Sequence, residues 1–137
     1  MDILRTHQMF MDFAVRVAQE SYCNRKRVGA ILVRGTNILA IGFNGTGAGQ
    51  DNNCEDENGL TKPEVIHAED NVYRKLLTST ESAEGSTLYI TLSPCVRCAQ
   101  LIVDSGTKQV FYQKEYKCNK GIKLLEANHV QCTLLYC

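Results

Sequence analysis

The sequence lacks the features that mark secreted, membrane-spanning and nucleic-acid-coating proteins. Its 137 residues include no apolar stretch near the roughly 20 residues that a membrane-spanning helix needs. Residues 1–5 do not begin a basic stretch with an apolar run behind it, so we expect no signal peptide and a cytoplasmic protein without membrane contact. Basic and acidic residues number 15 each, so a broad basic surface for duplex nucleic acid is not expected either.

Histidine is scarce, with three residues, whereas cysteine is frequent, with seven. An odd number of cysteines in a reducing compartment argues against a disulfide framework and favours metal ligation or burial. The length fits one domain, assigned to residues 1–137, which is long enough to bury a core.

Hydrophobic periodicity predicts alternating helices and short strands. An amphipathic helix is predicted over about 6–20, with further helices over 65–77, 95–104 and 121–127. Strands are predicted over 28–33, 38–42, 87–91, 109–112 and 130–135. The first two strands form a hairpin, and the later alternation of strands and helices favours parallel pairing. The predicted fold is a three-layer α/β/α sandwich with a mixed sheet of about five strands, interrupted by a long polar loop over 43–63.

Two short motifs carry the strongest chemical signal. They are His-Ala-Glu at 67–69 and Pro-Cys-Val-Arg-Cys at 94–98. Cys95 and Cys98 lie three residues apart in the first turn of a predicted helix, which puts both sulfurs on one face. The positive helix N-terminus favours their thiolates. His67 opens another predicted helix, so its ring can face the same point.

One histidine and two cysteines make an open zinc site with a fourth position for a water, whose pKa zinc lowers to about 7. Glu69 follows His67 closely enough to carry protons without binding the metal. A lone Cys-x-x-Cys is most often half of a structural zinc site or a redox pair, and a lone His-x-Glu is almost uninformative. Their combination in this order, each opening a predicted helix, is the pattern of zinc-dependent deaminases.

Further segments extend this pattern along nearly the whole chain. They are Val-Gly-Ala-Ile at 28–31, Gly-Phe-Asn-Gly at 42–45, the run from Thr87 to Cys95, Ser-Gly-Thr-Lys at 105–108 and the helix at 121–125. With them the chain resembles the deoxycytidylate (dCMP) deaminases of the zinc-dependent cytidine/deoxycytidylate deaminase family. The resemblance implies a cytidine deaminase-like fold. It also implies hydrolysis of dCMP to dUMP and ammonia, which supplies dUMP for thymidylate synthesis.

The resemblance also implies the catalytic roles. It makes His67, Cys95 and Cys98 the ligands of one catalytic Zn²⁺ per chain. It makes Glu69 the group that delivers protons to ring N3 and to the leaving amine.

Several further residues are expected to contact the substrate. The resemblance implies that the Ala68 N–H holds a base oxygen, that the Ser93 carbonyl accepts from the exocyclic amine, and that Asn44 bonds the base or sugar. Thr46 belongs to the same set. Tyr116 matches a substrate-contacting tyrosine of the family, and the alternative for it is a half-buried loop aromatic.

A monophosphate needs a local cationic clamp in a protein without net charge. Lys26 and Arg27, just before the strand at 28–33, are therefore the expected phosphate ligands. The alternative is that 25–27 is only a solvated basic turn.

Some relatives hold a second, structural zinc, and this chain departs from their ligand pattern. Cys23 and Cys54 match two of the ligands, but Val65 stands where the pattern has a glutamate. No histidine lies between Cys54 and His67. This argues against a second site and leaves the two cysteines as free thiols or as a disulfide.

Regulation and assembly are implied by the resemblance alone. dCMP deaminases are commonly hexamers activated by dCTP and inhibited by dTTP, with Mg²⁺ bound to the effector. The glycine-rich element at 42–49 allows a ligand to approach the backbone closely. Gly42, Phe43, Asn44 and Gly45 are therefore candidate effector contacts, and a lid without an effector is the alternative.

Three rival functions stay open from the sequence. The first is a deaminase of another cytosine or adenine nucleoside or nucleotide. The second is a structural zinc module without turnover, and the third is a Cys-x-x-Cys oxidoreductase.

Overall fold

The computed structural model describes residues 3–46 and 53–135. In chain order its elements are α1 (Ile3–Ala18), β1 (Gly29–Arg34), β2 (Asn37–Phe43), α2 (Ala68–Leu76), β3 (Thr87–Leu92), α3 (Val96–Ser105), β4 (Gln109–Lys114), α4 (Lys120–Ala127) and β5 (Gln131–Leu134). This order of helices and strands confirms the one predicted from hydrophobic periodicity. Of the glycine-rich element, Gly47 and Gly49 lie outside the described residues.

Two helices differ from their predicted bounds by more than one residue. The first was predicted over 6–20 but begins at Ile3 and ends at Ala18, where Gln19 and Glu20 already bond to carbonyls three residues back, as in a closing 3₁₀ turn. The second was predicted from 65 but begins at Ala68. Ile66 exchanges both backbone hydrogen bonds with Gly45, which keeps it extended and delays the helix.

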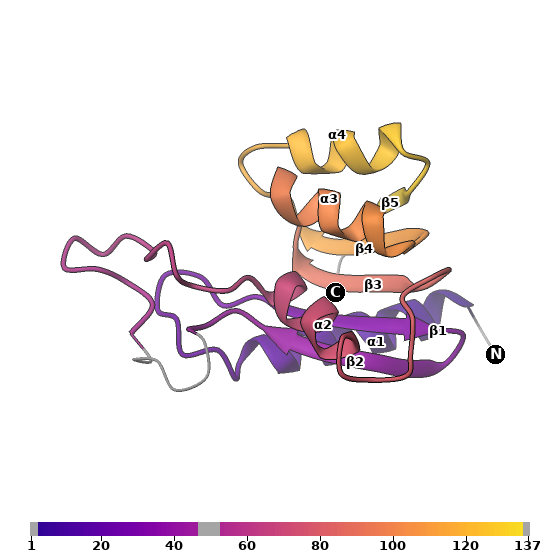
Figure 1. Ribbon diagram of the computed structural model, residues 1–137, viewed down its shortest axis with the longest axis horizontal. Helices are drawn as coiled ribbons and strands as arrows, with labels where there is room; N and C mark the ends of the chain where they lie inside the picture. The colour runs from indigo at the N-terminus through magenta and orange to yellow at the C-terminus, as the bar shows by residue number, and fades with distance from the viewer. Residues whose placement is uncertain (1–2, 47–52, 136–137) are drawn as a thin grey trace.

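The strands form one five-stranded mixed sheet in the order β2-β1-β3-β4-β5. β1 pairs antiparallel with β2 and with β3, which confirms the predicted hairpin. β4 pairs parallel with β3 and with β5, and these pairs are joined by the crossover helices α3 and α4. Figure 1 shows these two helices stacked over the β3–β5 half of the sheet.

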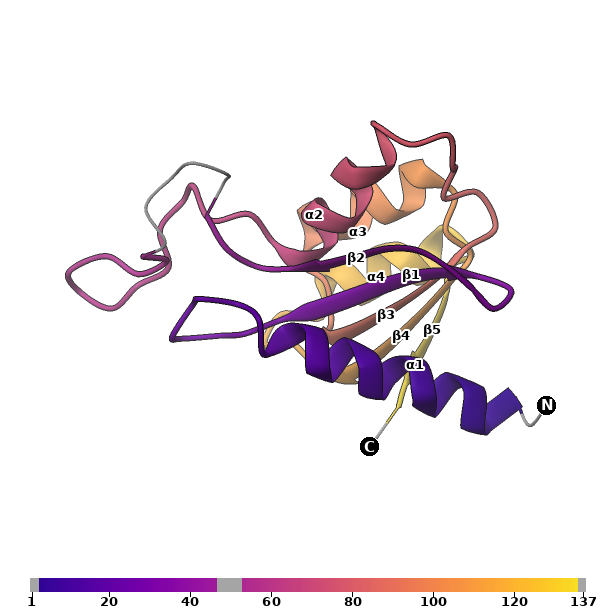
Figure 2. The same ribbon diagram turned by 90° about the horizontal axis from the view of Figure 1, so that it is seen from below.

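The sheet lies between two helical layers, as predicted. Figure 2 shows α1 alone on one face and α2, α3 and α4 on the other. One buried cluster joins α1 residues such as Met11 to Ile31, Tyr89 and Phe111. The larger cluster lies on the opposite face and joins residues such as Leu88 to all three remaining helices. Among the described residues, no helix is long and apolar enough to cross a membrane.

One disulfide joins Cys23 to Cys54. Of the two alternatives left by the sequence, free thiols or a bonded pair, the structure has the bonded pair. The bond ties the segment between α1 and β1 to the long loop that follows β2. Both segments extend together from one end of the sheet (Figure 1).

The last crossover helix supports the start of α3 through a close backbone contact. Gly121 lies so near the Pro94 carbonyl that a β-carbon at this position would come within 2.1 Å of its oxygen. The Cys95 carbonyl group would also lie 3.0 Å away. A glycine is therefore required where α4 packs against the segment that carries Cys95.

We predict that Gly121→Ala destabilises the protein. Helix propensity alone would stabilise it by about 1 kcal/mol, but the clash with Pro94 outweighs this, because overpacking of a filled site costs about 1–3 kcal/mol. Thermal or denaturant unfolding measures the change. Lys123→Ala, an exposed replacement in the same helix, should stay within about 0.5 kcal/mol of the parent. A Gly121→Ala variant more stable than the parent would contradict the contact.

Candidate active site

The three expected zinc ligands come together where α2 and α3 begin. His67 Nδ1 lies 3.3 Å from Cys98 Sγ and 3.7 Å from Cys95 Sγ. All three ligand atoms lie within 4.8 Å of one another. A tetrahedral zinc with bonds of about 2.3 Å to sulfur and about 2.0 Å to nitrogen separates such ligands by about 3.5 Å. The spacing of these side chains therefore fits zinc.

The environment of the two cysteines suits metal binding. Hydrogen bonds from the Cys98 thiol and from His67 lower the pKa of Cys95 to about 3. The hydrogen bond to Cys95 raises the pKa of Cys98, and burial raises it further. The same contact with Cys95 raises the pKa of His67. The thiolate is thus favoured at Cys95, whereas Cys98 and His67 give up their protons when a cation binds, as such ligands do.

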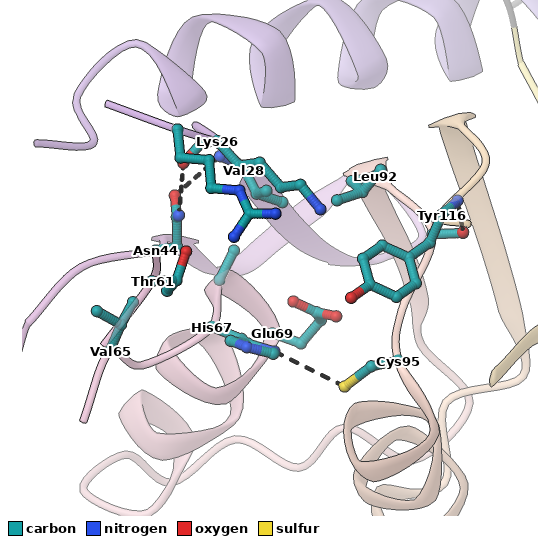
Figure 3. Close-up of a pocket in the computed structure, with 13 residues that line it drawn as sticks. Lys26, Val28, Asn44, Thr61, Val65, His67, Glu69, Leu92, Cys95 and Tyr116 are labelled. Carbon is teal, nitrogen blue, oxygen red and sulfur yellow. Dashed lines mark hydrogen bonds between the residues drawn. The ribbon is translucent and has the colours of Figure 1, made fainter. Parts of the chain in front are cut away.

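Glu69 stands in the first turn of α2 as a buried carboxyl group, with 4% of its surface exposed. Burial raises its pKa to about 7, although its own backbone N–H and the charge of His67 act in the opposite direction. At neutral pH, a group with a pKa near 7 can both accept a proton and donate one, because neither transfer is strongly unfavourable. Figure 3 shows the carboxylate between His67 and Tyr116, facing the cavity.

A cavity of about 200 Å³ opens onto these groups. The residues that line it are Arg25, Lys26, Val28, Asn44, Thr61, Val65, His67, Ala68, Glu69, Leu92, Ser93, Cys95 and Tyr116. They come from five separate stretches of chain, and Figure 3 shows Lys26 across the cavity from Cys95. The structure thus brings expected metal, proton-transfer and phosphate groups around one space.

The basic turn, residues 24–27, contributes two of its three cations to the cavity. Arg25 and Lys26 line it, whereas Arg27 does not. Arg27 instead donates from Nε to the Cys23 carbonyl at 3.0 Å, which folds it back onto its own turn. Of the two residues expected from the sequence to bind phosphate, Lys26 lines the cavity and Arg27 does not, while the neighbouring Arg25 does. The run of three basic residues does not itself say which ones face inward.

Asn44 lines the cavity, but its carboxamide also holds the basic turn. Its Oδ1 accepts the Val28 N–H at 2.8 Å, and its Nδ2 donates to the Lys26 carbonyl at 2.8 Å. One amide hydrogen and one lone pair are left for a ligand. The direct contact with base or sugar expected from the sequence stays a prediction.

Ser93 and Tyr116 form the wall that follows β3 and β4. Ser93 Oγ accepts the Tyr116 N–H at 2.7 Å, and the Ser93 N–H donates to the Lys114 carbonyl. These bonds fix the Tyr116 ring, over which Lys26 Nζ lies 4.6 Å from the centroid. Tyr116 thus faces the site and contacts one of its cations, as a cation–π pair.

Other expected residues lie elsewhere, and one lining residue had no signal in the sequence. Thr46, Gly42, Phe43 and Gly45 do not line the cavity. Thr61 does, because an isolated bridge to Glu55 folds the long loop back toward the site. Such a pairing inside a polar loop leaves no periodic pattern to predict it from.

The position of the second zinc of some relatives is filled differently here. Val65 packs against Cys23 and Cys54 in a small buried cluster, an apolar side chain where those relatives have a glutamate. Glu55 approaches the same cysteines, with a carboxylate oxygen and the two sulfurs within 4.8 Å. The carboxylate accepts backbone N–H groups of the basic turn.

The sequence and the fold both match known deaminases. The family model for the cytidine and deoxycytidylate deaminase zinc-binding region matches residues 4–114. The deoxycytidylate deaminase of Mycobacterium phage D29 is 34% identical over 122 residues, which cover 79% of this chain and 94% of the phage protein. The human deoxycytidylate deaminase is 35% identical over 126 residues, covering 83% of this chain and 67% of the human one.

Among solved structures, the dCMP deaminase of cyanophage S-TIM5, crystallised with dCMP and dUMP, superposes with a TM-score of 0.92. It is 41% identical, and the match covers 95% of this chain and 97% of the phage chain. The similarity extends beyond the zinc motifs to the whole sandwich. The chain therefore belongs to the cytidine and deoxycytidylate deaminase family and is a deaminase.

Proposed function

We propose that this deaminase hydrolyses dCMP to dUMP and ammonia and so supplies dUMP for thymidylate synthesis in the cytoplasm. One observation carries the substrate: the cavity lined by the zinc ligands His67 and Cys95 and by Glu69 is also lined by Arg25 and Lys26. A cytosine needs the first set and a monophosphate needs the second. The relatives named above support the same substrate.

The reaction replaces the amino group on C4 of cytosine with an oxygen from water. His67, Cys95 and Cys98 would hold one zinc per chain, which would supply Lewis-acid activation of that water. Glu69 accepts one proton of the water and passes it to ring N3. It then takes the remaining proton from the hydroxyl now on C4 and delivers it to the amine, so that the C4–N bond breaks, ammonia leaves and the C4 carbonyl forms. Its near-neutral pKa suits both directions of transfer.

The base is oriented by the start of α2 and the end of β3. Ala68 is the first residue of α2, so its N–H has no carbonyl partner one turn earlier and is available for a base oxygen. The Ser93 carbonyl accepts from the exocyclic amine on the opposite wall. Asn44 bonds the base or the sugar with its remaining hydrogen, whereas Thr46, two residues further on, does not line the cavity.

The phosphate is bound by Arg25 and Lys26. The pKa of Lys26 is lowered by burial and then by the charges of Arg25 and Lys117. Crowded cations of this kind attract a dianion, which relieves their mutual repulsion. Tyr116 holds Lys26 over its ring on the side that faces the cavity.

The rival functions fit the site less well. A closed structural zinc would use a fourth protein ligand, whereas the site groups three side chains beside a cavity. A Cys-x-x-Cys redox pair does not require a histidine and a buried glutamate beside its two sulfurs. A deaminase of RNA would need a broad cationic surface, and the chain has no net charge.

We also propose regulation by dCTP as activator and dTTP as inhibitor, each with Mg²⁺, in a homohexamer. The family resemblance supports this. Physically, Gly42, Phe43 and Gly45 flank Asn44, whose side chain bonds to the basic turn on both sides of Arg27. An effector that binds one arrangement of this element better than the other would shift substrate affinity.

Glu69→Gln should retain the fold and about one zinc atom per chain, and lose turnover of dCMP by about 10²–10⁴-fold, the range for a general acid–base group. The glutamine keeps the shape but neither accepts nor delivers the proton. Ammonia release and metal analysis measure the two properties. Glu64→Gln, an exposed neighbour before α2, is the control and should behave as the parent. Full turnover in Glu69→Gln would rule out the proposed chemistry.

Neutralising the clamp should discriminate between nucleotide and nucleoside. Arg25→Gln and Lys26→Gln are each expected to lower kcat/KM for dCMP by about 10-fold to 100-fold, since a hydrogen bond to a charged group contributes about 1.5–3 kcal/mol. The value for deoxycytidine should change little. Arg27→Gln is the matched control, because Arg27 does not line the cavity. Unchanged values on both substrates would mean that the turn is only a solvated surface, and equal losses on both would contradict a phosphate-specific role.

Regulation is tested by dCMP saturation curves with dCTP or dTTP and Mg²⁺, together with sedimentation of the protein. We expect sigmoidal curves that dCTP shifts to lower and dTTP to higher substrate concentrations, from a hexamer. Hyperbolic curves that neither triphosphate moves, from a monomer, would leave the element at 42–45 as a lid without an effector.

A further inference from the structure

The basic turn is held from two sides by side chains that belong to other segments. On the β2 side, Asn44 bonds to the backbone of Lys26 and Val28. On the side of the long loop, Glu55 places its carboxylate oxygens 3.2 and 3.3 Å from the Asn24 nitrogen and 3.3 Å from the Arg25 nitrogen. The turn therefore has few conformations open to it.

Among the acidic residues that the structure describes in this loop, Glu55 is buried, with 8% of its surface exposed, whereas Asp56 and Glu57 are exposed. Burying a carboxylate is costly unless charge-assisted hydrogen bonds replace its water. Here backbone N–H groups of the turn supply such bonds, so the carboxylate fixes the path of the chain. Glu55 does not line the cavity and so does not touch a substrate bound there.

The chain around Glu55 is itself anchored. Its neighbour Cys54 is bonded to Cys23, one residue before the turn, and the Cys54 carbonyl accepts the Lys62 N–H at 2.7 Å. Glu55 also pairs with Thr61, which lines the cavity. The carboxylate thus belongs to a small framework that has the cavity wall on one side and the basic turn on the other.

Electrostatics makes such a restraint necessary. Arg25 and Lys26 are adjacent like charges on one side of the cavity, and the pKa of Lys26 is lowered by burial and then by the charges of Arg25 and Lys117. The two exposed side chains repel each other. Tyr116 and Asn44 restrain Lys26, and the Glu55 carboxylate restrains the Arg25 backbone. Glu55 holds the turn by hydrogen bonds to its backbone. Its carboxylate therefore does not pair with the Arg25 or Lys26 side chain, where it would compete with the phosphate.

We propose that Glu55 is a positioning residue that sets the preference for the monophosphate over the free nucleoside, by fixing the backbone from which Arg25 and Lys26 reach the phosphate. This rests on the proposed function, because it needs a phosphorylated substrate in the cavity.

The test compares Glu55→Ala, Glu55→Gln and the exposed neighbour Glu57→Ala with the parent protein, all in dithiothreitol so that the Cys23–Cys54 bond does not substitute for Glu55. The readout is kcat/KM for dCMP divided by kcat/KM for deoxycytidine. We expect Glu55→Ala to lower this ratio by about tenfold, as for the loss of buried hydrogen bonds, through a higher KM for dCMP with a similar kcat. Glu55→Gln should regain most of the ratio, because its carbonyl still accepts an N–H, and Glu57→Ala should keep it.

A merely structural role predicts a different result. Glu55→Ala would then lose kcat/KM on both substrates alike or melt at a much lower temperature, and the folded Glu55→Gln variant would show no selective loss or rescue. An unchanged ratio in Glu55→Ala overturns the proposal. Metal analysis excludes one more role: a second zinc atom per chain that disappears in Glu55→Ala would make Glu55 a ligand and also overturn it.

The clamp variants separate this inference from the proposed function. If Arg25→Gln and Lys26→Gln do not change the ratio, the phosphate clamp itself is wrong. If they lower it while Glu55→Ala does not, only the role of Glu55 fails.

Discussion

The site depends on two helix N-termini that converge on one point. His67 and Cys95 occupy the N-cap positions of α2 and α3, yet neither side chain caps its own helix. N-caps are usually small polar residues that bond to the first turn. Here the capping bond is given up and both side chains turn outward to a shared ligand position. The positive helix ends stabilise the negative sulfur, so the backbone supplies part of the electrostatics that a metal site needs.

The local part of this arrangement could be predicted from sequence, and the long-range part could not. Cys95 and Cys98 are related by helical spacing, and the succession of helices and strands follows from alternating periodicities, so both predictions were confirmed. The direction in which Arg27 points depends on a bond to Cys23, and the late start of α2 depends on Ile66 pairing with Gly45. The first contact lies within one turn, and the second joins segments far apart along the chain. In both cases the residue types alone do not say which way a side chain points or which backbone groups pair.

Charge is balanced over the chain and concentrated in the cavity. The equal numbers of acidic and basic residues conceal a cavity in which Arg25 and Lys26 face Glu69, a buried glutamate whose pKa burial raises to about 7. The only acidic side chain that supports the basic turn, among the described residues, is directed at backbone amides. The charges of Arg25 and Lys26 are therefore not neutralised by this carboxylate and can bind an anionic ligand, although the protein as a whole has no net charge.

Tyr116, in the cavity wall, and Gly121, in close contact with Pro94 and Cys95, both lie beyond residue 114, where the match to the family model ends. The two positions are constrained in different ways. Tyr116 borders the cavity through its side chain and is not one of the three zinc ligands, so exchange there alters the cavity wall and not the ligand set. Gly121 lies against the backbone that carries Cys95, so any side chain there presses on the zinc ligand segment. The last segment of the chain therefore meets the site in two ways, through a side chain at the cavity and through the backbone beside a ligand.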